Sequence, residues 1–295
     1  MNANSQEPSL DDLDALLEED ESIVSALRTG DLIDLAILAA FFALALVSFF
    51  RKDTRLKYAT MVAAIGYMGF AKGNLVSMVH IFGLAQLSFP DFKSSLSWYG
   101  LMGFTLASTL LWGRLYCGRI CAFGALTQLM DRVLPKRWRY EPPAWFDRKA
   151  IYLKYVILVS VLAYFLITRD NFVYKYVEPF WMFTLSGTSV MWTLLAMLLL
   201  ATVFIRNFYC RYLCSVGAAL GVLSTVSAFG IKRWQQCKTC KLCDKACEWG
   251  AIRGLKISKQ ECVRCDDCEI LYADQAHCPH WLLAKKRARK LGVAA

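Results

Sequence analysis

The chain has 295 residues, 57% of them hydrophobic, and its mean hydropathy is +0.37. This composition excludes an ordinary soluble domain and indicates a membrane protein. The formal net charge of +10 would suggest a nucleic-acid partner in a soluble domain. Here Lys and Arg gather at the ends of apolar runs and at the C-terminus, which is typical of topology signals and of anionic lipid contacts. We therefore expect membrane lipid, and no nucleic acid, as a partner.

The N-terminus is polar and acidic, so the sequence predicts an acidic tail over residues 1–30 and no cleavable signal peptide. The 12 cysteines are then expected to be metal ligands in a reducing compartment and not a disulfide framework.

Apolar runs predict an α-helical polytopic membrane protein with about five transmembrane helices. Residues 32–50 are almost uninterruptedly apolar and long enough to cross a hydrocarbon core of about 30 Å. The other predicted spans are residues 58–70, 98–114, 150–168 and 190–205. The shorter run 75–89, closed by Pro90, predicts an interfacial or re-entrant segment.

Basic loops follow the first, third and fifth predicted spans. The positive-inside rule places those loops and the C-terminus in the cytoplasm of a bacterial inner membrane, with the N-terminus outside. The basic tail over 284–295 is expected to contact anionic lipid.

Eight cysteines near the C-terminus follow the spacing of a bacterial-type two-[4Fe-4S] ferredoxin domain, which we expect over residues 231–283. Three closely spaced thiolates hold three irons of one cubane, and the fourth cysteine of each run reaches the other cluster. This rule assigns one cluster to Cys237, Cys240, Cys243 and Cys278, and the other to Cys262, Cys265, Cys268 and Cys247. Zinc ribbons are the competing interpretation. A zinc ribbon takes two C-x2-C pairs as its four ligands, so a third cysteine at the same two-residue spacing is not expected there.

The second cysteine run departs from the simplest pattern. Nine residues separate Cys268 from Cys278, and Glu248 stands where proline often follows the fourth cysteine. His277 and His280 flank Cys278, so a histidine in place of that thiolate is an open alternative.

The remaining four cysteines form an internal repeat within a transmembrane domain expected over residues 31–230. Each half reads Y-C-x3-C-x2-G-A, and residues four apart share one face of a helix. Each helix end is therefore expected to present a dithiol, with cations beside it that favour the thiolate. The cysteines are Cys117, Cys121, Cys210 and Cys214, and the cations are Arg114, Arg119, Arg206 and Arg211. These thiols could hold a further metal centre, or they could be buried small apolar side chains.

With these motifs, the sequence resembles the NosR and NapH type membrane polyferredoxins over residues 58–282. The resemblance rests on the C-x3-C pairs, the tandem ferredoxin motifs ending in Cys278-Pro279, the Lys72-Gly73-Asn74-Leu75 turn and the Glu178-Pro179-Phe180 loop. The family motif usually reads C-x3-C-P, whereas Ala122 and Ser215 replace the prolines here. NosR also carries a flavin domain ahead of its helices, where this chain has an acidic tail.

The resemblance implies an electron-transfer subunit of a quinol dehydrogenase-like membrane oxidoreductase. Electrons would pass between the quinone pool or a cytoplasmic donor and an extracytoplasmic flavoprotein or cytochrome. The alternatives are a copper-handling or assembly protein for a respiratory enzyme, with thiols as soft ligands for Cu(I), and a thiol redox sensor.

Two isolated polar residues lie in the outer half. We expect His80 to be a hydrogen-bonded polar residue or a neighbour of an outer quinone site. Glu178 is expected to be a solvated loop acid, with acceptance of a quinol proton as the alternative.

Overall fold

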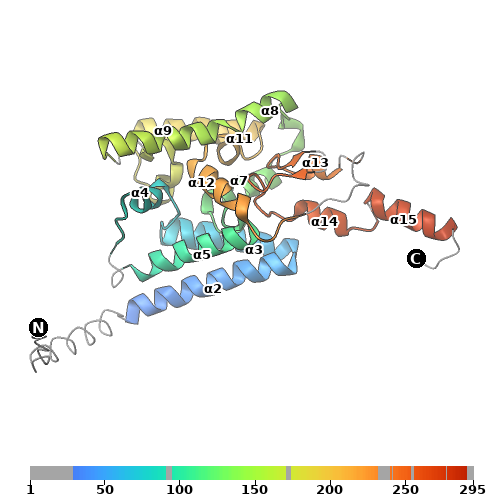
Figure 1. The fold of residues 1–295 in the computed structure, drawn as a ribbon, viewed down its shortest axis with the longest axis horizontal. Helices are drawn as coiled ribbons and strands as arrows, with labels where there is room; N and C mark the ends of the chain where they lie inside the picture. The colour runs from blue at the N-terminus through green and yellow to red at the C-terminus, as the bar shows by residue number, and fades with distance from the viewer. Residues whose placement is uncertain are drawn as a thin grey trace, which may run out of the picture.

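A computed structural model describes residues 29–90, 95–170, 174–231, 240, 242–253, 256–276 and 278–290. The described chain is mostly helical, as predicted (Figure 1). Its α-helices are α2 (Thr29–Arg51), α3 (Thr54–Ala63), α4 (Met78–Gln86), α5 (Leu96–Trp112), α6 (Leu115–Arg119), α7 (Ala122–Val133), α8 (Ala144–Ala150), α9 (Leu153–Thr168), α10 (Tyr174–Val177), α11 (Ser189–Phe204), α12 (Ser215–Leu223), α13 (Leu242–Ala246), α14 (Asp267–Ala273) and α15 (Pro279–Lys290).

Shorter elements complete the fold. A two-stranded antiparallel sheet pairs Ile252 with Ile257 and Arg253 with Lys256. The remaining elements are the π-helices η1 (Ala64–Ala71) and η4 (Tyr209–Leu213), the 3-10 helices η2 (Lys136–Trp138), η3 (Pro179–Thr184) and η5 (Ser224–Val226), and the strands β1 (Ile252–Arg253) and β2 (Lys256–Ile257).

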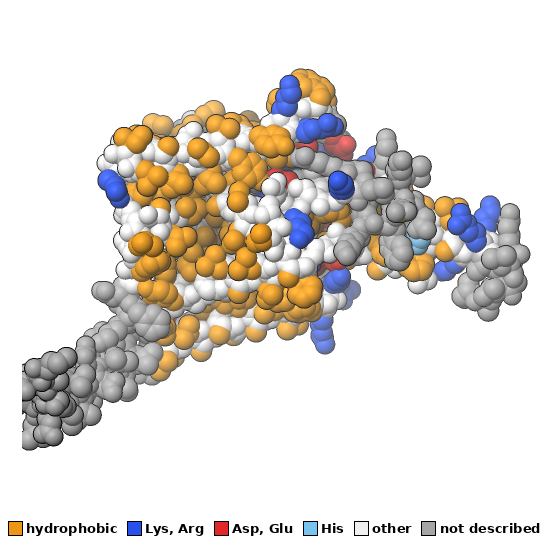
Figure 2. Space-filling model, in the orientation of Figure 1, with side chains coloured by type: hydrophobic (Ala, Val, Ile, Leu, Met, Phe, Trp, Pro, Cys, Tyr) orange, Lys and Arg blue, Asp and Glu red, His pale blue; other side chains and the backbone are white. Residues whose placement is uncertain are grey.

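The long helices form one block, and the cysteine-rich C-terminal segment lies at one end of it. In Figure 1, α2, α5 and α9 run across the block, α4 lies at the left end, and α13, α14 and α15 lie at the right. Apolar side chains cover much of the visible surface of the block in Figure 2. On α9 these exposed side chains include Val156, Val159 and Ile167, which is the surface that a lipid-facing helix presents.

Among the described residues, two helical stretches are long and apolar enough to cross a membrane, Leu32–Arg51 and Trp145–Thr168. Ser189–Phe204 and Ser215–Val226 are apolar but shorter. The five-helix topology therefore stays a prediction. The segment predicted as the second span begins as α3 and continues as the π-helix η1.

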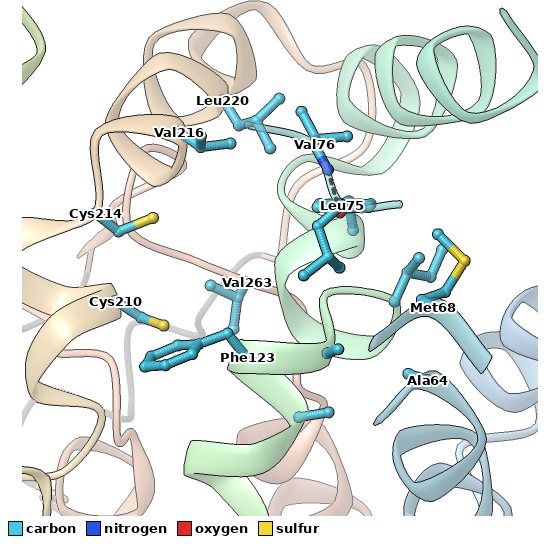
Figure 3. Close-up of a cluster of buried hydrophobic side chains, with 14 of the residues drawn as sticks. Ala64, Met68, Leu75, Val76, Phe123, Cys210, Cys214, Val216, Leu220 and Val263 are labelled. Atoms are coloured by element: carbon cyan, nitrogen blue, oxygen red, sulfur yellow. Dashed lines mark hydrogen bonds between the residues drawn. The ribbon is translucent and has the colours of Figure 1, made fainter. Parts of the chain in front are cut away.

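The C-terminal segment shares the hydrophobic core of the helical block. Val263, from the second cysteine run, is 1% exposed and lies among core side chains of the helices, near Phe123 in Figure 3. Trp249, two residues after Cys247, is also buried in this core. Burial of these two side chains fixes the cysteine-rich segment against the block by the hydrophobic effect.

Candidate iron–sulfur sites

The two C-x3-C motifs have the same backbone break. Cys117 lies in α6 and Cys121 is the N-cap of α7, with φ −63° and ψ 115°. Cys210 lies in η4 and Cys214 is the N-cap of α12, with φ −66° and ψ 107°. The prediction of a dithiol on one continuous helix is therefore wrong, because each helix ends between its two cysteines. The second thiol caps a new helix instead, and Cys214 Sγ accepts a hydrogen bond from Gly217 N at 3.2 Å.

The break explains the residue that follows each motif. Ala122 and Ser215 occupy the first helical position after the cap. Proline is favoured at this position because its missing N–H has no helical partner there. The family motif with proline therefore suits the same geometry, and both residues of this chain are fully buried.

The break brings the two motifs together in space. Cys121 lies within electrostatic range of Cys117 and Cys214. Cys210 lies within range of the other three thiols. In Figure 3 the sulfur atoms of Cys210 and Cys214 point the same way, into the interior of the block. We call these four residues the thiol site.

Arg114 lies between the thiol site and the second cysteine run. The side chain is 1% exposed, and its Nη2 atom lies 3.9 Å from Cys117 Sγ. Its Nη1 atom donates a hydrogen bond of 2.9 Å to the carbonyl of Gln260 and lies 3.7 Å from a carboxylate oxygen of Glu261. The charge of Arg114 also acts on Cys262. One buried cation is therefore shared by the two groups of cysteines.

Further buried contacts hold the second cysteine run against the first repeat. Arg119 forms an ion pair with Asp266, and Lys154 of α9 forms one with Glu261. A Cβ atom at Gly118 would collide with the carbonyl oxygen of Val263, so only glycine permits this approach. The segment from Gln260 to Asp266 thus lies directly against the C-x3-C motif.

The second repeat contacts the first cysteine run. Asn207 Nδ2 donates to Glu248 Oε2 at 3.2 Å, and Arg211 Nη1 donates to the Glu248 carbonyl at 3.2 Å. Arg211 also pairs with Asp147 of α8 at 2.6 Å. Because Glu248 directly follows Cys247, these contacts bring that cysteine to the second repeat.

Basic residues near the start of α3 hold α14. Lys52 pairs with Glu269 and Lys57 pairs with Asp267, each at 2.8 Å. The sequence predicted this basic loop only as a topology signal. Its lysines also attach the cysteine-rich segment to the block.

The C-terminal cysteines are grouped by their mutual electrostatic influence. Cys247, the fourth cysteine of the first run, lies within electrostatic range of Cys262, Cys265 and Cys268. Cys243 also acts on Cys268. Cys247 therefore lies near the second run in space, and its assignment to the cluster of that run stays a prediction.

The other end of the ferredoxin segment is described only in part. Cys278 is buried and precedes Pro279, the first residue of α15. The ring of His280 lies 5.9 Å from that of Tyr272 and stacks on it. Cys237 and His277 lie outside the described residues.

These cysteine groups offer the thiolate donors that cubane clusters use. In the part of the chain that the structure describes, no three His, Cys, Asp or Glu side chains converge as ligands of one metal ion. A cubane takes one thiolate per iron, so its ligands surround it and do not meet at one atom. Thiolates without oxygen or nitrogen ligands are also the donors that iron–sulfur clusters use.

Two carboxyls beside the cysteine runs are shielded from water, since Asp266 is buried and Glu248 is partly buried. Burial and, less strongly, the neighbouring Asp131 together raise the pKa of Glu248 to about 8. Burial also raises the pKa of Asp266 to about 6, although the charge of Arg119 opposes this shift. Both pKa shifts reflect the loss of water around a charged group at the contact between the segment and the helical block.

Loops from the other end of the block reach the thiol site. Tyr116, next to Cys117, accepts a hydrogen bond from Val76 N at 2.9 Å through its hydroxyl. The corresponding Tyr209 donates its hydroxyl to the carbonyl of Val177 at 3.1 Å. The tyrosine of each repeat therefore holds one of these two loops.

Glu178 is buried, so its prediction as a solvated loop acid is wrong. It is 2% exposed, and Oε1 accepts a hydrogen bond from Met78 N at 2.9 Å. Its side chain lies beside Ser215, the residue after Cys214. The loop folds inward because the N-terminus of α4 supplies a donor for the carboxylate.

His80 fits the prediction of a hydrogen-bonded polar residue. Its Nδ1 accepts from Ser77 N at 3.2 Å, and its ring stacks on Trp98 with centroids 5.5 Å apart. These contacts account for a polar residue in an apolar helix.

Sequence reasoning missed three buried residues at the contact between the helical block and the cysteine-rich segment: Lys154, Asn207 and Glu261. Lys154 was hidden within an apolar span. A buried charge in such a span needs a partner, and this requirement was the signal available in the sequence.

The fold and cysteine groups define an iron–sulfur protein of the electron-transfer class. Residues 94–141 and 186–233 each match the model of a 4Fe-4S binding domain, and each match contains one C-x3-C motif. Residues 235–289 match the NosR model. The chain belongs to the NosR/NapH-type iron–sulfur membrane proteins.

The similar proteins differ in length from this chain. "Regulatory protein NosR" of Pseudomonas aeruginosa is 31% identical over 258 residues, which cover 81% of this chain and 36% of that protein. "Protein NirI" of Paracoccus denitrificans is 34% identical over 61% of this chain and 28% of its own length. "Ferredoxin-type protein NapH" of Escherichia coli is 23% identical over 63% of this chain and 68% of its own. The chain spans about a third of the NosR relatives that it matches. No solved structure matches it significantly.

Proposed function

We propose that this chain carries electrons along a row of three thiolate-held iron–sulfur centres, from a cytoplasmic ferredoxin domain into the membrane. Cys237, Cys240, Cys243 and Cys278 would hold the distal cluster, and Cys247, Cys262, Cys265 and Cys268 the proximal one. The thiol site would hold the third centre. Such clusters supply one-electron transfer when bound. The protein would act as a subunit linking the quinone pool or a cytoplasmic donor to an extracytoplasmic flavoprotein or cytochrome.

The single observation that carries this proposal is the position of Arg114. Its buried guanidinium touches Cys117 and lies within electrostatic range of Cys262, so the thiol site and the proximal cysteines are neighbours. Two clusters in the cytoplasm cannot pass electrons through about 30 Å of hydrocarbon alone. A third centre beside Arg114 would supply the missing intermediate position.

Other observations support the same arrangement. The 4Fe-4S binding domain model matches both C-x3-C segments, which supports iron and not copper at the thiol site. The exposed apolar side chains of α9 and α11 support a multi-pass topology. Lys52 and Lys57, which pair with acidic residues of α14, support a cytoplasmic location for the ferredoxin segment.

Iron counting in cysteine variants tests the proposal. The protein is purified anaerobically and analysed for iron, sulfide and the EPR signals of the reduced sample. We expect about twelve irons in the native chain and about eight in Cys117→Ser with Cys121→Ser, at four irons per cubane. Cys210→Ser with Cys214→Ser is the matched second variant and is expected to lose the same signal, because the two pairs share one centre.

The outcomes separate the proposal from the alternatives. A native protein with about eight irons, unchanged by either double variant, would rule out the third centre. Copper bound in proportion to the four thiols would favour the metal-handling function. A reversible Cys117–Cys121 disulfide without change in iron content would favour the redox sensor.

A further inference from the structure

A polar cavity of about 580 Å³ lies where the helical block meets the ferredoxin segment. On the side of the block it is lined by the start of α3, the end of α7 and residues that follow η2 and α11. On the side of the ferredoxin segment it is lined by the end of α13, Glu248 and Asp267, the first residue of α14. We call it the junction cavity, because a ligand in it would touch both parts of the molecule.

Basic side chains outnumber acidic ones in the lining of the junction cavity. The acidic residues are Asp131, Glu248 and Asp267, and the basic residues are Lys57, Arg132, Arg139, Arg206 and Lys245. Asp267 pairs with Lys57 at 2.8 Å. Asp131 pairs with both Arg139 and Arg206. These internal pairs leave an excess of positive charge, which attracts an anion.

Two of the cations are buried in the wall of the cavity. The side chain of Lys57 is 5% exposed and that of Arg139 is 4% exposed. Arg139 Nη1 donates to the carbonyl of Thr202 at 2.7 Å, whereas Nε has no hydrogen-bond partner among the described residues. The Lys57 ammonium has three N–H groups, one of which bonds to Asp267. Because a buried donor without a partner is costly, these N–H groups favour an acceptor inside the cavity.

The edge of the junction cavity is apolar and exposed. Val133, Leu134 and Pro135 line this edge, and Val133 is 84% exposed. Trp138 and Tyr140 follow in the same connection between α7 and α8, and both are exposed. Exposed tryptophan and tyrosine rings are typical of the level of the lipid head groups. The cavity therefore combines a cationic interior with an apolar edge at the membrane surface.

We propose that the junction cavity binds one phosphate group, held from inside by Lys57 and Arg139 and from outside by Arg132 and Lys245. Guanidinium and ammonium groups are the usual partners of phosphate oxygens, and basic pockets beside membrane helices bind anionic head groups. The apolar edge at Val133 favours an anionic phospholipid as the source of the phosphate. Such a site does not depend on the third centre of the proposed function.

Native mass spectrometry counts the lipids that the protein binds. The full-length protein with its clusters is purified anaerobically in a neutral detergent, stripped of lipid and titrated with dioctanoyl-phosphatidylglycerol. One molecule is expected to bind more tightly than any further ones. Dioctanoyl-phosphatidylcholine should bind at least about tenfold more weakly, because its choline group cancels the phosphate charge. Equal binding of the two lipids would overturn the proposal.

A pair of exposed cations tests the site without disturbing its buried ion pairs. Arg132→Gln with Lys245→Gln should weaken phosphatidylglycerol at least about tenfold, because both side chains line the cavity. Arg137→Gln with Lys256→Gln is the matched control, since it removes the same charge from two exposed side chains outside the cavity. An equal loss in both double variants would show attraction by the overall charge of the protein and refute a defined site.

A phospholipid and a soluble phosphate compound are distinguished by the need for a tail. Equilibrium dialysis with radiolabelled inorganic phosphate measures binding without one. Val133→Asn should weaken phosphatidylglycerol about threefold and leave inorganic phosphate unchanged. Val226→Asn is the control, at a valine that is 69% exposed and lies outside the cavity. Phosphate that binds as tightly as the lipid, with no effect of Val133→Asn, would identify a soluble phosphate compound as the ligand of the same site.

The position between the two parts of the molecule gives a second readout. A ligand that binds the native state stabilises it, so phosphatidylglycerol should raise the denaturation midpoint of the native protein and of the control pair. It should raise the midpoint of Arg132→Gln with Lys245→Gln much less. Iron and sulfide are measured on the same samples. Full iron content with binding of neither lipid nor phosphate would refute the site and leave the electron-transfer function standing.

Discussion

The two C-x3-C repeats share one backbone geometry but contact the cysteine-rich segment in different ways. In both, the second cysteine caps a new helix with nearly the same φ and ψ. Three residues before the first cysteine, the first repeat has the cation Arg114 and the second has the neutral Asn207, both fully buried. Arg119 of the first repeat corresponds to Tyr212 of the second. The first repeat thus binds the cysteine-rich segment through buried ion pairs, and the second binds it through hydrogen bonds from Asn207 and Arg211 to Glu248.

This difference indicates that the two repeats provide equivalent pairs of thiols, while each repeat is attached to the cysteine-rich segment by different contacts. The segment with Cys262 and Cys265 lies against the first repeat through Arg119 and Gly118, while Glu248, which follows Cys247, is held by the second repeat. The first repeat, with its buried charges, should therefore control both the stability of this contact and the reduction potential of a centre beside it. Substitutions at corresponding positions test this expectation.

Arg119→Ala is expected to have the largest effect on stability. It leaves the carboxylate of Asp266 buried without its partner, which costs about 3–5 kcal/mol for a buried ion pair. The measurement is the denaturation midpoint of the purified protein, followed through the visible absorption of its clusters. The double variant Arg119→Gln with Asp266→Asn removes both charges and should recover most of the loss. A midpoint for Arg119→Ala within error of the native one would show that the first repeat does not depend on this charge.

Gly118→Ala should have the next largest effect. The added methyl group meets the backbone of Val263, which cannot move without displacing the proximal cysteines, so we expect a loss of about 1–3 kcal/mol from overpacking. Thermal denaturation and iron content are measured together. Gly103→Ala on α5 is the control, because nothing lies within 4 Å of its added Cβ. If both variants behave like the native protein, the cysteine segment does not pack on the first repeat as closely as the structure has it.

Arg114→Gln should make the reduction potentials of both neighbouring centres more negative. Reduction adds an electron, which the guanidinium stabilises, and each 1.4 kcal/mol of lost stabilisation corresponds to about 60 mV for a one-electron couple. EPR-monitored redox titration measures the shift. Arg206→Gln removes the same charge from the second repeat, where the side chain is partly exposed and contacts Asp131 and the carbonyl of Lys245. Its shift should be smaller, and equal shifts for the two variants would argue against a special position for Arg114.

The helices and the cysteine repeat could be predicted from the sequence, because both depend on local composition and spacing. The predicted spans 32–50 and 190–205 differ by only a few residues from α2 and α11. The break within each C-x3-C motif was missed, because apolar periodicity does not record where a helix ends inside an apolar run. The backbone shows it through Cys121 and Cys214, whose extended conformation begins a new helix.

The contacts between the helical block and the cysteine-rich segment could not be predicted, because they join residues far apart in the chain. Lys154 and Glu261 are separated by 107 residues, and Asn207 and Glu248 by 41. No periodic pattern links such pairs, and each is chosen by the packing of the segment on the block. Glu178 was expected in water for the same reason, since the loop sequence alone does not show that it folds against α4.

Tyr212→Phe should have the smallest effect, and it tests the comparison at the position that corresponds to Arg119. The substitution removes the hydroxyl that donates to Asp147 at 2.6 Å and leaves the ring in place. Asp147 keeps its ion pair with Arg211, so no charge is left without a partner, and the loss should be about 0.5–1.5 kcal/mol. The denaturation midpoint is again the measurement, with unchanged iron content as the control. A loss as large as that of Arg119→Ala would mean that the contact of the second repeat with α8 contributes as much stability as the buried ion pair of the first repeat.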